Sequence, residues 1–385
     1  MAERTRPLEL ALVAHRLAAA TPTGIGRYYA EIARGLAAVA DPVTHRYTVA
    51  STREPAAPTW VEPPLHLASL GGPRKVRAVA WATIGFPRVD AALGHPDLVH
   101  ALQTWTAIPT RARLVATVHD LMPMLHPEWH GPLESWSFRR GVRQAADHAD
   151  LLIADSAHTA ALVTERLGVA PDRLRVVWIG AGDEFRARPS TEVRAATCAR
   201  HGVEPGRFLV TVGAVSQRKN LAVVLRALAQ VDPSVLGTPA LLVAGPPGKG
   251  FDAIEAEVAR LDLTDRVRFA GFVPDADLPV LVGTSLALVH PSRDEGFGMT
   301  PIEAMAAGVP ALASAVGSVP EVAGAAAVLL DPDDADAWAA AITRLATDDD
   351  HRQDLVARGA IHQARFTWRQ AALDTLAVHD EVLGR

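Results

Sequence analysis

The sequence of 385 residues contains a single cysteine, Cys198, so the chain cannot form an internal disulfide. This usage is typical of a reducing compartment, and we expect a cytoplasmic protein. An excess of basic residues is also missing, because 38 Lys and Arg are set against 43 Asp and Glu. A protein that binds nucleic acid needs a basic surface, so we expect no nucleic-acid partner. No apolar run approaches the roughly 20 residues that a membrane-spanning helix requires.

Short apolar runs recur along the chain, and turn residues and a helical stretch follow most of them. The runs cover residues 8–14, 114–118, 151–154, 175–179, 208–212, 241–244, 267–269 and 286–290. Continuous apolar strands separated by helices indicate parallel sheets that are covered on both faces. A polar, arginine-rich stretch over residues 183–207 divides the series, and the chain is too long for one ordinary domain. We therefore predict an α/β protein of two doubly wound domains, residues 1–183 and 184–369.

Open parallel sheets bind ligands outside the carboxyl ends of their strands. The residues that follow the apolar runs are therefore the first candidates for a binding site. They are Gly24–Gly26, His119, residues 213–219, 271–274 and 292–303. A lone histidine after a strand is more often structural than functional, so His119 needs further support.

The most informative stretch is residues 291–310, PSRDEGFGMTPIEAMAAGVP. A strand ends, a glycine loop turns, and Thr300-Pro301 begins a helix. The glycines let backbone N–H groups approach an anion, and the helix N-terminus is suited to a phosphate. Glu295 and Glu303 lie on either side of this loop, where carboxylates can accept hydrogen bonds from sugar hydroxyls.

Glu303 has a second interpretation. Thr300-x-x-Glu303, with proline at the first helical position, is also the pattern of a helix capping box. Both interpretations of Glu303 stay open at this point. Glu295 lies in a loop between Asp294 and a glycine, where neither a helix cap nor a core position calls for a carboxylate.

This stretch resembles the Glu-x7-Glu signature of the retaining, GT-B-fold glycosyltransferases of family 4. Residues 213–221, GAVSQRKNL, resemble the phosphate-binding loop of the mannosyltransferase-like subgroup, and residues 267–274, VRFAGFVP, resemble a later strand and turn. Residues 118–121, VHDL, and 23–28, TGIGRY, resemble motifs of the first domain. The resemblance implies two Rossmann-like domains that face a central cleft, with the acceptor on the first and the donor on the second.

The resemblance also implies roles for the residues that match. Glu295 contacts the hydroxyls of the donor sugar, and His119 lies close to that sugar. Arg218 and Lys219 neutralise the diphosphate, and Glu303 holds the ribose.

The remaining donor-binding residues follow from the same resemblance. The backbone at Gly24 and Gly26 faces the diphosphate. The nucleobase lies near Gly271, Phe272 and Val273. The set is completed by Gly213, Gly296, Phe297, Gly298, Met299 and Thr300.

One position departs from the pattern. Many relatives carry arginine directly after the glycine of the phosphate loop, but this chain has Ala214. The sequence therefore predicts that this loop supplies a cation to the phosphates, but it does not fix the geometry of that contact.

The activity that the resemblance implies is a retaining, metal-independent hexosyl transfer, of the kind used in polysaccharide biosynthesis. A nucleotide diphosphate sugar is the co-substrate, and no cofactor is needed. GDP-mannose is favoured, with UDP- and dTDP-sugars open, and the acceptor is a saccharide, a lipid-linked saccharide or a secondary metabolite. A nucleotide-sugar epimerase of the same fold and a non-catalytic nucleotide-sugar-binding protein are the alternatives.

Two further segments allow more than one interpretation. A helix over residues 370–385 either returns to the first domain, as in similar enzymes, or closes the second. An aromatic and basic cluster is either a solvated helix face, which we favour, or a peripheral contact with the inner face of a membrane. The cluster consists of Trp129, Trp136, Phe138, Arg139, Arg140 and Arg143.

Overall fold

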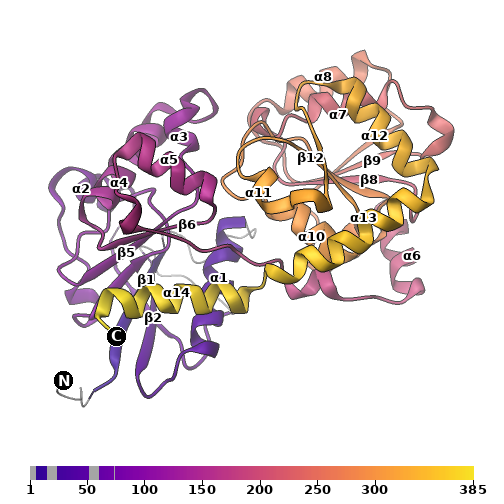
Figure 1. Cartoon of the computed structure of the whole chain (residues 1–385). Helices are drawn as coiled ribbons and strands as arrows, with labels where there is room; N and C mark the ends of the chain where they lie inside the picture. Colours follow the sequence, from indigo (N-terminus) through magenta and orange to yellow (C-terminus); the bar gives the residue numbers. More distant parts are fainter. Residues whose placement is uncertain (1–5, 15–23, 52–59, 73) are drawn as a thin grey trace. The chain divides into compact units, whose positions relative to one another are not determined.

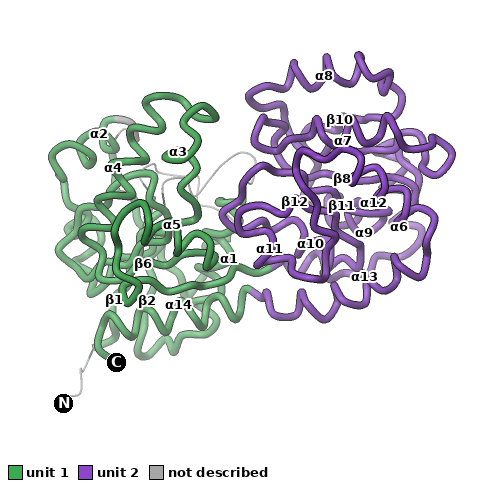
Figure 2. Tube along the Cα trace, turned by 45° about the horizontal axis from the view of Figure 1, so that its top comes forward, with its two compact units in different colours: residues 1–180, 368–385 green, residues 181–367 purple. Residues whose placement is uncertain are grey.

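The computed structural model describes residues 6–14, 24–51, 60–72 and 74–385. The chain forms two compact units, which Figure 2 shows in different colours. Unit 1 consists of Met1–Gly180 and Trp368–Arg385, and unit 2 consists of Ala181–Thr367. The chain therefore passes once through unit 2 and returns to unit 1 for its last helix.

Unit 1 is built on a parallel sheet, which has seven strands in the described part of the chain. In spatial order they are β3 (His66–Ser69), β2 (His45–Ser51), β1 (Leu8–Ala14), β4 (Leu98–Ala101), β5 (Arg113–Val118), β6 (Leu151–Ala154) and β7 (Leu174–Val176). Figure 1 labels β1, β2, β5 and β6 of this sheet. The chain runs outwards from β1 to β3 and then returns to place β4 beside β1. Such a reversal is the topological switch point beside which open sheets bind ligands.

Both faces of this sheet are buried at its central strand β1. Ala11 and Val13 of β1 belong to one hydrophobic cluster with Phe138 of α4 (Pro132–His148). Leu10 and Leu12 are equally buried and point to the other side, because side chains alternate along a strand. The other helices of the unit are α1 (Gly24–Val39), α2 (Arg74–Ile84), α3 (Met122–Leu125), α5 (Ala157–Leu167) and α14 (Trp368–Leu383).

The last helix, α14, packs directly against α1. The two helices approach so closely at Gly35 that a Cβ atom there would lie 2.8 Å from the Cβ of Ala372. That distance is shorter than real carbon contacts, so the position requires glycine. The last helix is therefore an integral part of unit 1.

A chain of buried polar side chains crosses unit 1 from α14 to α1. His379 of α14 is hydrogen-bonded to Tyr47 of β2 at 3.2 Å and to His100 of β4 at 3.0 Å. His100 is in turn 2.9 Å from the hydroxyl of Thr117, which is 3.1 Å from the Tyr28 hydroxyl. Each member can act as donor to one neighbour and acceptor from the other only while both imidazoles stay neutral.

Unit 2, which is described throughout, repeats the same topology with six parallel strands. In spatial order they are β10 (Val267–Gly271), β9 (Leu241–Ala244), β8 (Leu209–Val212), β11 (Ala287–His290), β12 (Ala311–Ser314) and β13 (Val328–Leu330). The switch point lies between β8 and β11, so the loops after these strands emerge side by side.

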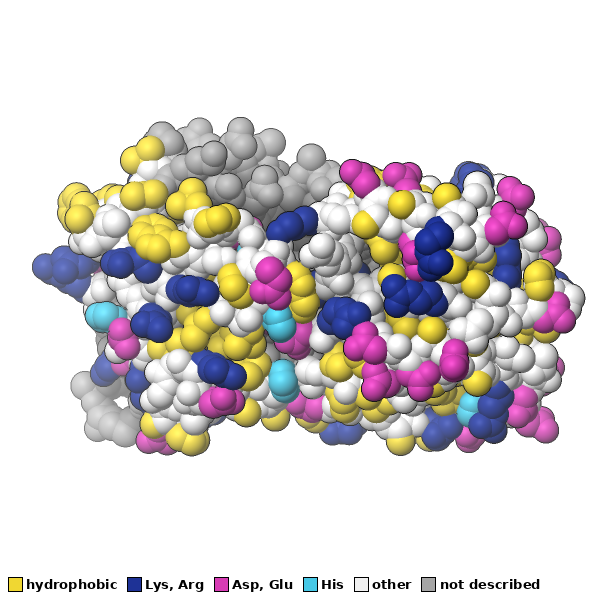
Figure 3. All heavy atoms as spheres, turned by 90° about the horizontal axis from the view of Figure 1, so that it is seen from above, with side chains coloured by type: hydrophobic (Ala, Val, Ile, Leu, Met, Phe, Trp, Pro, Cys, Tyr) yellow, Lys and Arg dark blue, Asp and Glu magenta, His cyan; other side chains and the backbone are white. Residues whose placement is uncertain are grey.

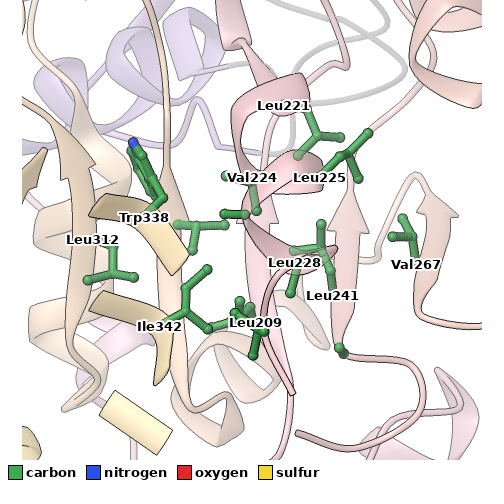
Figure 4. Close-up of a cluster of buried hydrophobic side chains, with 14 of the residues drawn as sticks. Leu209, Leu221, Val224, Leu225, Leu228, Leu241, Val267, Leu312, Trp338 and Ile342 are labelled. Carbon is green, nitrogen blue, oxygen red and sulfur yellow. The ribbon is translucent and has the colours of Figure 1, made fainter. Parts of the chain in front are cut away.

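The core of unit 2 packs helices onto this sheet (Figure 4). Trp338 and Ile342 of α12 (Ala335–Thr347) are fully buried with Leu225 of α7 (Leu221–Leu228) and Leu209 of the central strand. The other helices are α6 (Thr191–Arg200), α8 (Phe251–Arg260), α9 (Leu278–Thr284), α10 (Met299–Ala307), α11 (Val319–Ala323) and α13 (Asp349–His362). The predicted class of two doubly wound parallel-sheet α/β domains is confirmed.

Each apolar run of the sequence forms a strand, and its carboxyl end usually falls where the run ends. The pattern of apolar runs does not predict five further strands of the described residues, which are β2, β3, β4, β12 and β13. The sequences of these strands are short or contain polar residues, such as His45 and Arg46 in β2. They become strands because they pair with neighbouring strands in the folded unit. None of the helices in the described ranges is long and apolar enough to cross a membrane.

The buried histidines predict a loss of stability in acid. Burial lowers the pKa of His379 to about 3, so the folded protein keeps the imidazole neutral while the unfolded chain protonates it near pH 6.5. Stability should therefore fall as the pH drops below 6.5, by about 2 kcal/mol at pH 5 for one such group. We expect the wild-type melting temperature to fall between pH 7 and pH 5.

A His379→Gln variant keeps a donor and an acceptor but does not titrate, so its melting temperature should fall less. His66→Gln, at an exposed position of the same unit, is the matched control and should behave like the wild type. An equal fall in all three proteins would show that the buried chain is not the cause.

Candidate functional site

Two loops at the switch point of unit 2 carry the predicted cations and carboxylate. Arg218 and Lys219 lie in a short 3-10 turn after β8, and Glu295 lies in the loop after β11. The backbone N–H of Arg293 donates to the carbonyl of Arg218 at 2.8 Å, so the two loops are held together. Neighbouring strands thus bring residues 76 positions apart into one site.

The carboxylate of Glu295 is the centre of this site. Lys219 Nζ donates to its Oε1 at 2.8 Å, and Arg218 Nη1 lies 2.7 Å from its Oε2. The hydroxyl of Ser292 also donates to Oε1, at 2.7 Å. The Nε2 atom of His290, the last residue of β11, lies 3.4 Å from the same oxygen. Both carboxylate oxygens are therefore engaged by the protein.

The electrostatics of the cluster keep Glu295 ionised. Burial alone would raise the pKa of its carboxyl group, but Lys219 and Arg218 outweigh burial and hold that pKa well below its usual value. Burial lowers the pKa of Lys219, opposed by Glu295 and assisted by Arg218. Two cations therefore lie beside the carboxylate of Glu295.

The backbone around Glu295 is fixed as well. Its carbonyl oxygen accepts hydrogen bonds from both the N–H and the hydroxyl of Ser318, at 3.1 and 2.9 Å. On the other loop, Gly213 has a φ of +124°, and a Cβ there would lie 3.4 Å from the Cε of Lys219. The missing side chain at Gly213 leaves room for the lysine to reach Glu295.

Glu303 lies on the second turn of α10, and its side chain is buried. It contributes to the electrostatic field on Lys219, so it belongs to the same neighbourhood. The helix begins at Met299 with Gly298 as its N-cap, and Thr300 instead shares a hydrogen bond with His290 Nδ1 at 2.8 Å. The capping box that was the alternative interpretation of Thr300 and Glu303 is therefore wrong.

Of the other predicted donor-binding residues of unit 2, some lie in the loop before α10 and others lie at the end of β10 and after it. Gly296 and Phe297 complete the loop before α10, with Phe297 buried against Phe366. Gly271 ends β10, two strands away from β8, and Phe272 after it is half exposed while Val273 is buried. An exposed aromatic ring at a strand end suits a planar base. The predicted position of Phe272 near the nucleobase stays a prediction.

In unit 1, His119 follows β5 and is held on both ring nitrogens. Nδ1 lies 2.6 Å from Oδ2 of Asp155, and Nε2 lies 2.9 Å from the carbonyl oxygen of Leu102. A carbonyl oxygen can only accept, so Nε2 donates to Leu102, and a second donation from Nδ1 to Asp155 would give a doubly protonated, positively charged ring. Burial would lower the pKa of His119, but Asp155 outweighs it and raises that pKa.

Gly24 and Gly26 lie in the first turn of α1, and residue 23 of the predicted glycine motif lies outside the described residues. Tyr28, one turn further on, contacts the ring of His119 edge-on with 4.6 Å between centroids. The start of α1 and His119 thus meet at the same edge of the unit 1 sheet.

Sequence reasoning missed two residues of these sites, His290 and Asp155, and it placed Ser292 in the candidate range 292–303 without assigning it a role. Asp155 directly follows a predicted strand, which is the signal that could have found it. His290 gives no such signal, because it ends a buried strand and reads as part of the core.

Family models match both halves of the chain. Residues 22–182 match the model described as Glycosyltransferase Family 4, and residues 199–362 match Glycosyl transferases group 1. The chain is 31% identical to D-inositol 3-phosphate glycosyltransferase of Salinispora tropica, over 94% of this chain and 81% of that protein. The chain belongs to the family 4 glycosyltransferases. The glycosyltransferase is also 28% identical to O-antigen chain mannosyltransferase B of Escherichia coli, over 69% of each chain.

Solved structures agree on the architecture of the glycosyltransferase. The structure of Anabaena HepE in complex with UDP and glucose superposes with a TM-score of 0.74 and 20% identity, over 97% of this chain and 100% of that chain. At this identity the likeness concerns the fold alone, and it confirms the predicted GT-B fold with two Rossmann-like units. Family membership favours glycosyl transfer over the epimerase and non-catalytic alternatives.

Replacing Asp155 tests the charge that we assign to His119. An Asp155→Asn variant loses the carboxylate that outweighs burial, so the pKa of His119 should fall below 6.5 and the ring should be neutral at pH 7. In the wild type the raised pKa stabilises the fold below pH 6.5, and this contribution is lost as the pH rises through the folded value. The ¹⁵N shifts of the histidine side chain measure both nitrogens directly.

We expect two protonated nitrogens in the wild type at pH 7 and one in the variant. Asp172→Asn, at an exposed position of the same unit, is the control and should leave His119 doubly protonated. A neutral His119 ring in the wild-type protein would contradict the assignment.

Proposed function

We propose that the glycosyltransferase moves a hexose from a nucleotide diphosphate sugar to a hydroxyl group of its acceptor, with retention of configuration and without a metal ion. The convergence of Arg218 and Lys219 on Glu295, beside the first turn of α10, carries this proposal. The acceptor is a saccharide, a lipid-linked saccharide or a small molecule, in line with polysaccharide biosynthesis.

The site offers the charges that a diphosphate needs. Arg218 and Lys219 are 28% and 21% exposed, so both cations are partly buried but reachable. The helix α10 directs its N-terminal N–H groups to the same region, which adds positive potential. Together these groups replace the magnesium ion that other nucleotide-binding sites use to balance phosphate charge.

The same charges favour the reaction. When the bond between sugar and phosphate breaks, the diphosphate gains negative charge and the sugar becomes oxocarbenium-like. Cations fixed beside the leaving group stabilise this transition state more than the ground state. The acceptor hydroxyl attacks from the side on which the diphosphate leaves, and the departing phosphate oxygen takes its proton. Glu295 orients the sugar through its hydroxyls, and His119 lies close to the sugar.

GDP-mannose is the donor that we favour. The relative from Escherichia coli is named a mannosyltransferase, and the loop containing Arg218 and Lys219 is of the kind found in mannosyltransferase-like members. UDP-glucose is the main alternative, because HepE was solved with UDP and glucose.

We also propose that unit 1 contacts an anionic membrane surface. Around α2 and the start of α4, large hydrophobic side chains are exposed, with Ile84 and Leu133 both at 72% and Trp136 at 40%. Arg140 joins the two helices, because its Nε donates to the carbonyl of Ala82 and its guanidinium lies over Trp136. Figure 3 shows hydrophobic side chains beside Lys and Arg on the unit 1 part of the surface. Apolar and basic side chains together suit an anionic lipid surface.

Removing either partner of the central ion pair should stop transfer. We expect Lys219→Ala and Glu295→Ala each to lower turnover of GDP-mannose at least about a hundredfold, since each removes one preorganised electrostatic contact. Lys249→Ala and Glu255→Ala change exposed residues of the same unit and should keep wild-type turnover. Circular dichroism would check that all four variants fold, and near-normal turnover by Lys219→Ala or Glu295→Ala would contradict the proposal.

The donor itself is tested by thermal shift with GDP-mannose, UDP-glucose and a dTDP-sugar. A ligand stabilises the state that it binds, so the true donor should raise the melting temperature of the wild type and of Lys249→Ala but not of Lys219→Ala. The same donors are then offered with saccharide acceptors, and the anomeric configuration of the product is read by NMR. An inverted product would overturn retention, and a shift only with UDP-glucose would overturn the preference for mannose.

The membrane contact predicts binding to anionic vesicles. In co-sedimentation at low salt, we expect wild-type protein to bind phosphatidylglycerol vesicles and not phosphatidylcholine vesicles. An Ile84→Ser/Phe86→Ser variant should lose most of this binding, while Ile361→Ser, at an equally exposed position of unit 2, should keep it. Equal binding by both variants, or none by the wild type, would remove the proposed surface.

A further inference from the structure

Side chains of the protein itself engage both oxygens of Glu295. Glu295 Oε1 accepts from Lys219 and Ser292, and Oε2 is paired with Arg218. Glu295 therefore occupies the two cations that the proposed function assigns to the donor diphosphate. A diphosphate that binds here must take Lys219 and Arg218 at least partly away from Glu295, and a sugar hydroxyl needs a free oxygen on the same carboxylate.

One titratable group remains beside Glu295 when the cations turn to the phosphates. His290 is buried at the end of β11, and its Nε2 lies 3.4 Å from Glu295 Oε1. That nitrogen makes no hydrogen bond within the described part of the chain. On the other side of the ring, Nδ1 shares a 2.8 Å hydrogen bond with the hydroxyl of Thr300, which fixes the orientation of the imidazole.

The charges around His290 come from three segments. Arg218 and Lys219 lie after β8, Glu295 lies after β11, and Glu303 lies on α10. Burial lowers the pKa of His290, Lys219 and Arg218 add to this, and Glu295 opposes them, so the pKa lies below its ordinary value of 6.5 and the ring is neutral at pH 7. Two cations and two carboxylates give no net charge, and a bound diphosphate adds two negative charges.

We propose that His290 takes up a proton from solvent when the donor binds, and that the resulting imidazolium replaces Lys219 and Arg218 as the partner of Glu295. The inference rests on the proposed function, because it assigns the two cations to the diphosphate. His290 acts through Glu295 and touches neither phosphate nor sugar, so it is a positioning residue. Its charge holds Glu295 ionised and in place for the sugar hydroxyls while the phosphates engage the cations.

Titration calorimetry at pH 7 in buffers of different ionisation enthalpy tests this uptake. The ligands are GDP-mannose and UDP-glucose, whose phosphates do not titrate near neutral pH. We expect binding to the wild type to take up about half a proton or more, and its affinity to increase as the pH falls from 8 to 6, by at most about tenfold per unit. His290→Gln should bind with no uptake and with an affinity that does not depend on pH over this range.

His66→Gln is the matched control and should take up protons like the wild type. In case His290→Gln folds poorly, ¹⁵N spectra of the wild-type histidines provide a second measurement, in which both ring nitrogens of His290 should carry protons only with ligand. Binding without proton uptake, or equal uptake by His290→Gln, would overturn the inference alone. Failure of every sugar nucleotide to bind would contradict the proposed function on which the inference rests.

Discussion

The ion pair between Glu295 and the neighbouring cations Arg218 and Lys219 is the interaction on which the site of unit 2 depends. Each charge alone would be costly at this depth, because a partly buried ion loses hydration. The three side chains stabilise one another, and Ser292 and Ser318 fix the carboxylate and its backbone. The fold thus holds two cations together at one point of the unit 2 site.

The departure at Ala214 finds its explanation in the same arrangement. Ala214 is exposed at the position where many relatives carry arginine, and the charge comes instead from the turn four and five residues later. That turn reaches the loop after β11 through the hydrogen bond between Arg293 and Arg218. The cations Arg218 and Lys219 come from the turn after β8. They lie next to Glu295 because β8 and β11 are neighbours at the switch point of the sheet.

Unit 1 uses charge in a different way. Asp155 raises the pKa of His119, whereas burial lowers the pKa of His100 and of His379 in a chain that reaches α14. Tyr28 links the two arrangements, since its hydroxyl meets Thr117 and its ring meets His119. The last helix of the chain is therefore joined by hydrogen bonds to the edge of the sheet where His119 lies.

The sequence by itself determined the two parallel-sheet units and the strand ends at which candidate residues lie, including Glu295 and Glu303, while the resemblance to a family singled out Arg218 and Lys219. It could do so because buried parallel strands are continuous apolar runs and because ligand-binding residues follow them directly. Only the tertiary structure decided that Thr300 pairs with His290 instead of capping α10, that Ser292 supports Glu295, and that Asp155 pairs with His119. These are contacts between side chains on different strands or loops, and no local pattern in the sequence encodes the distance between them.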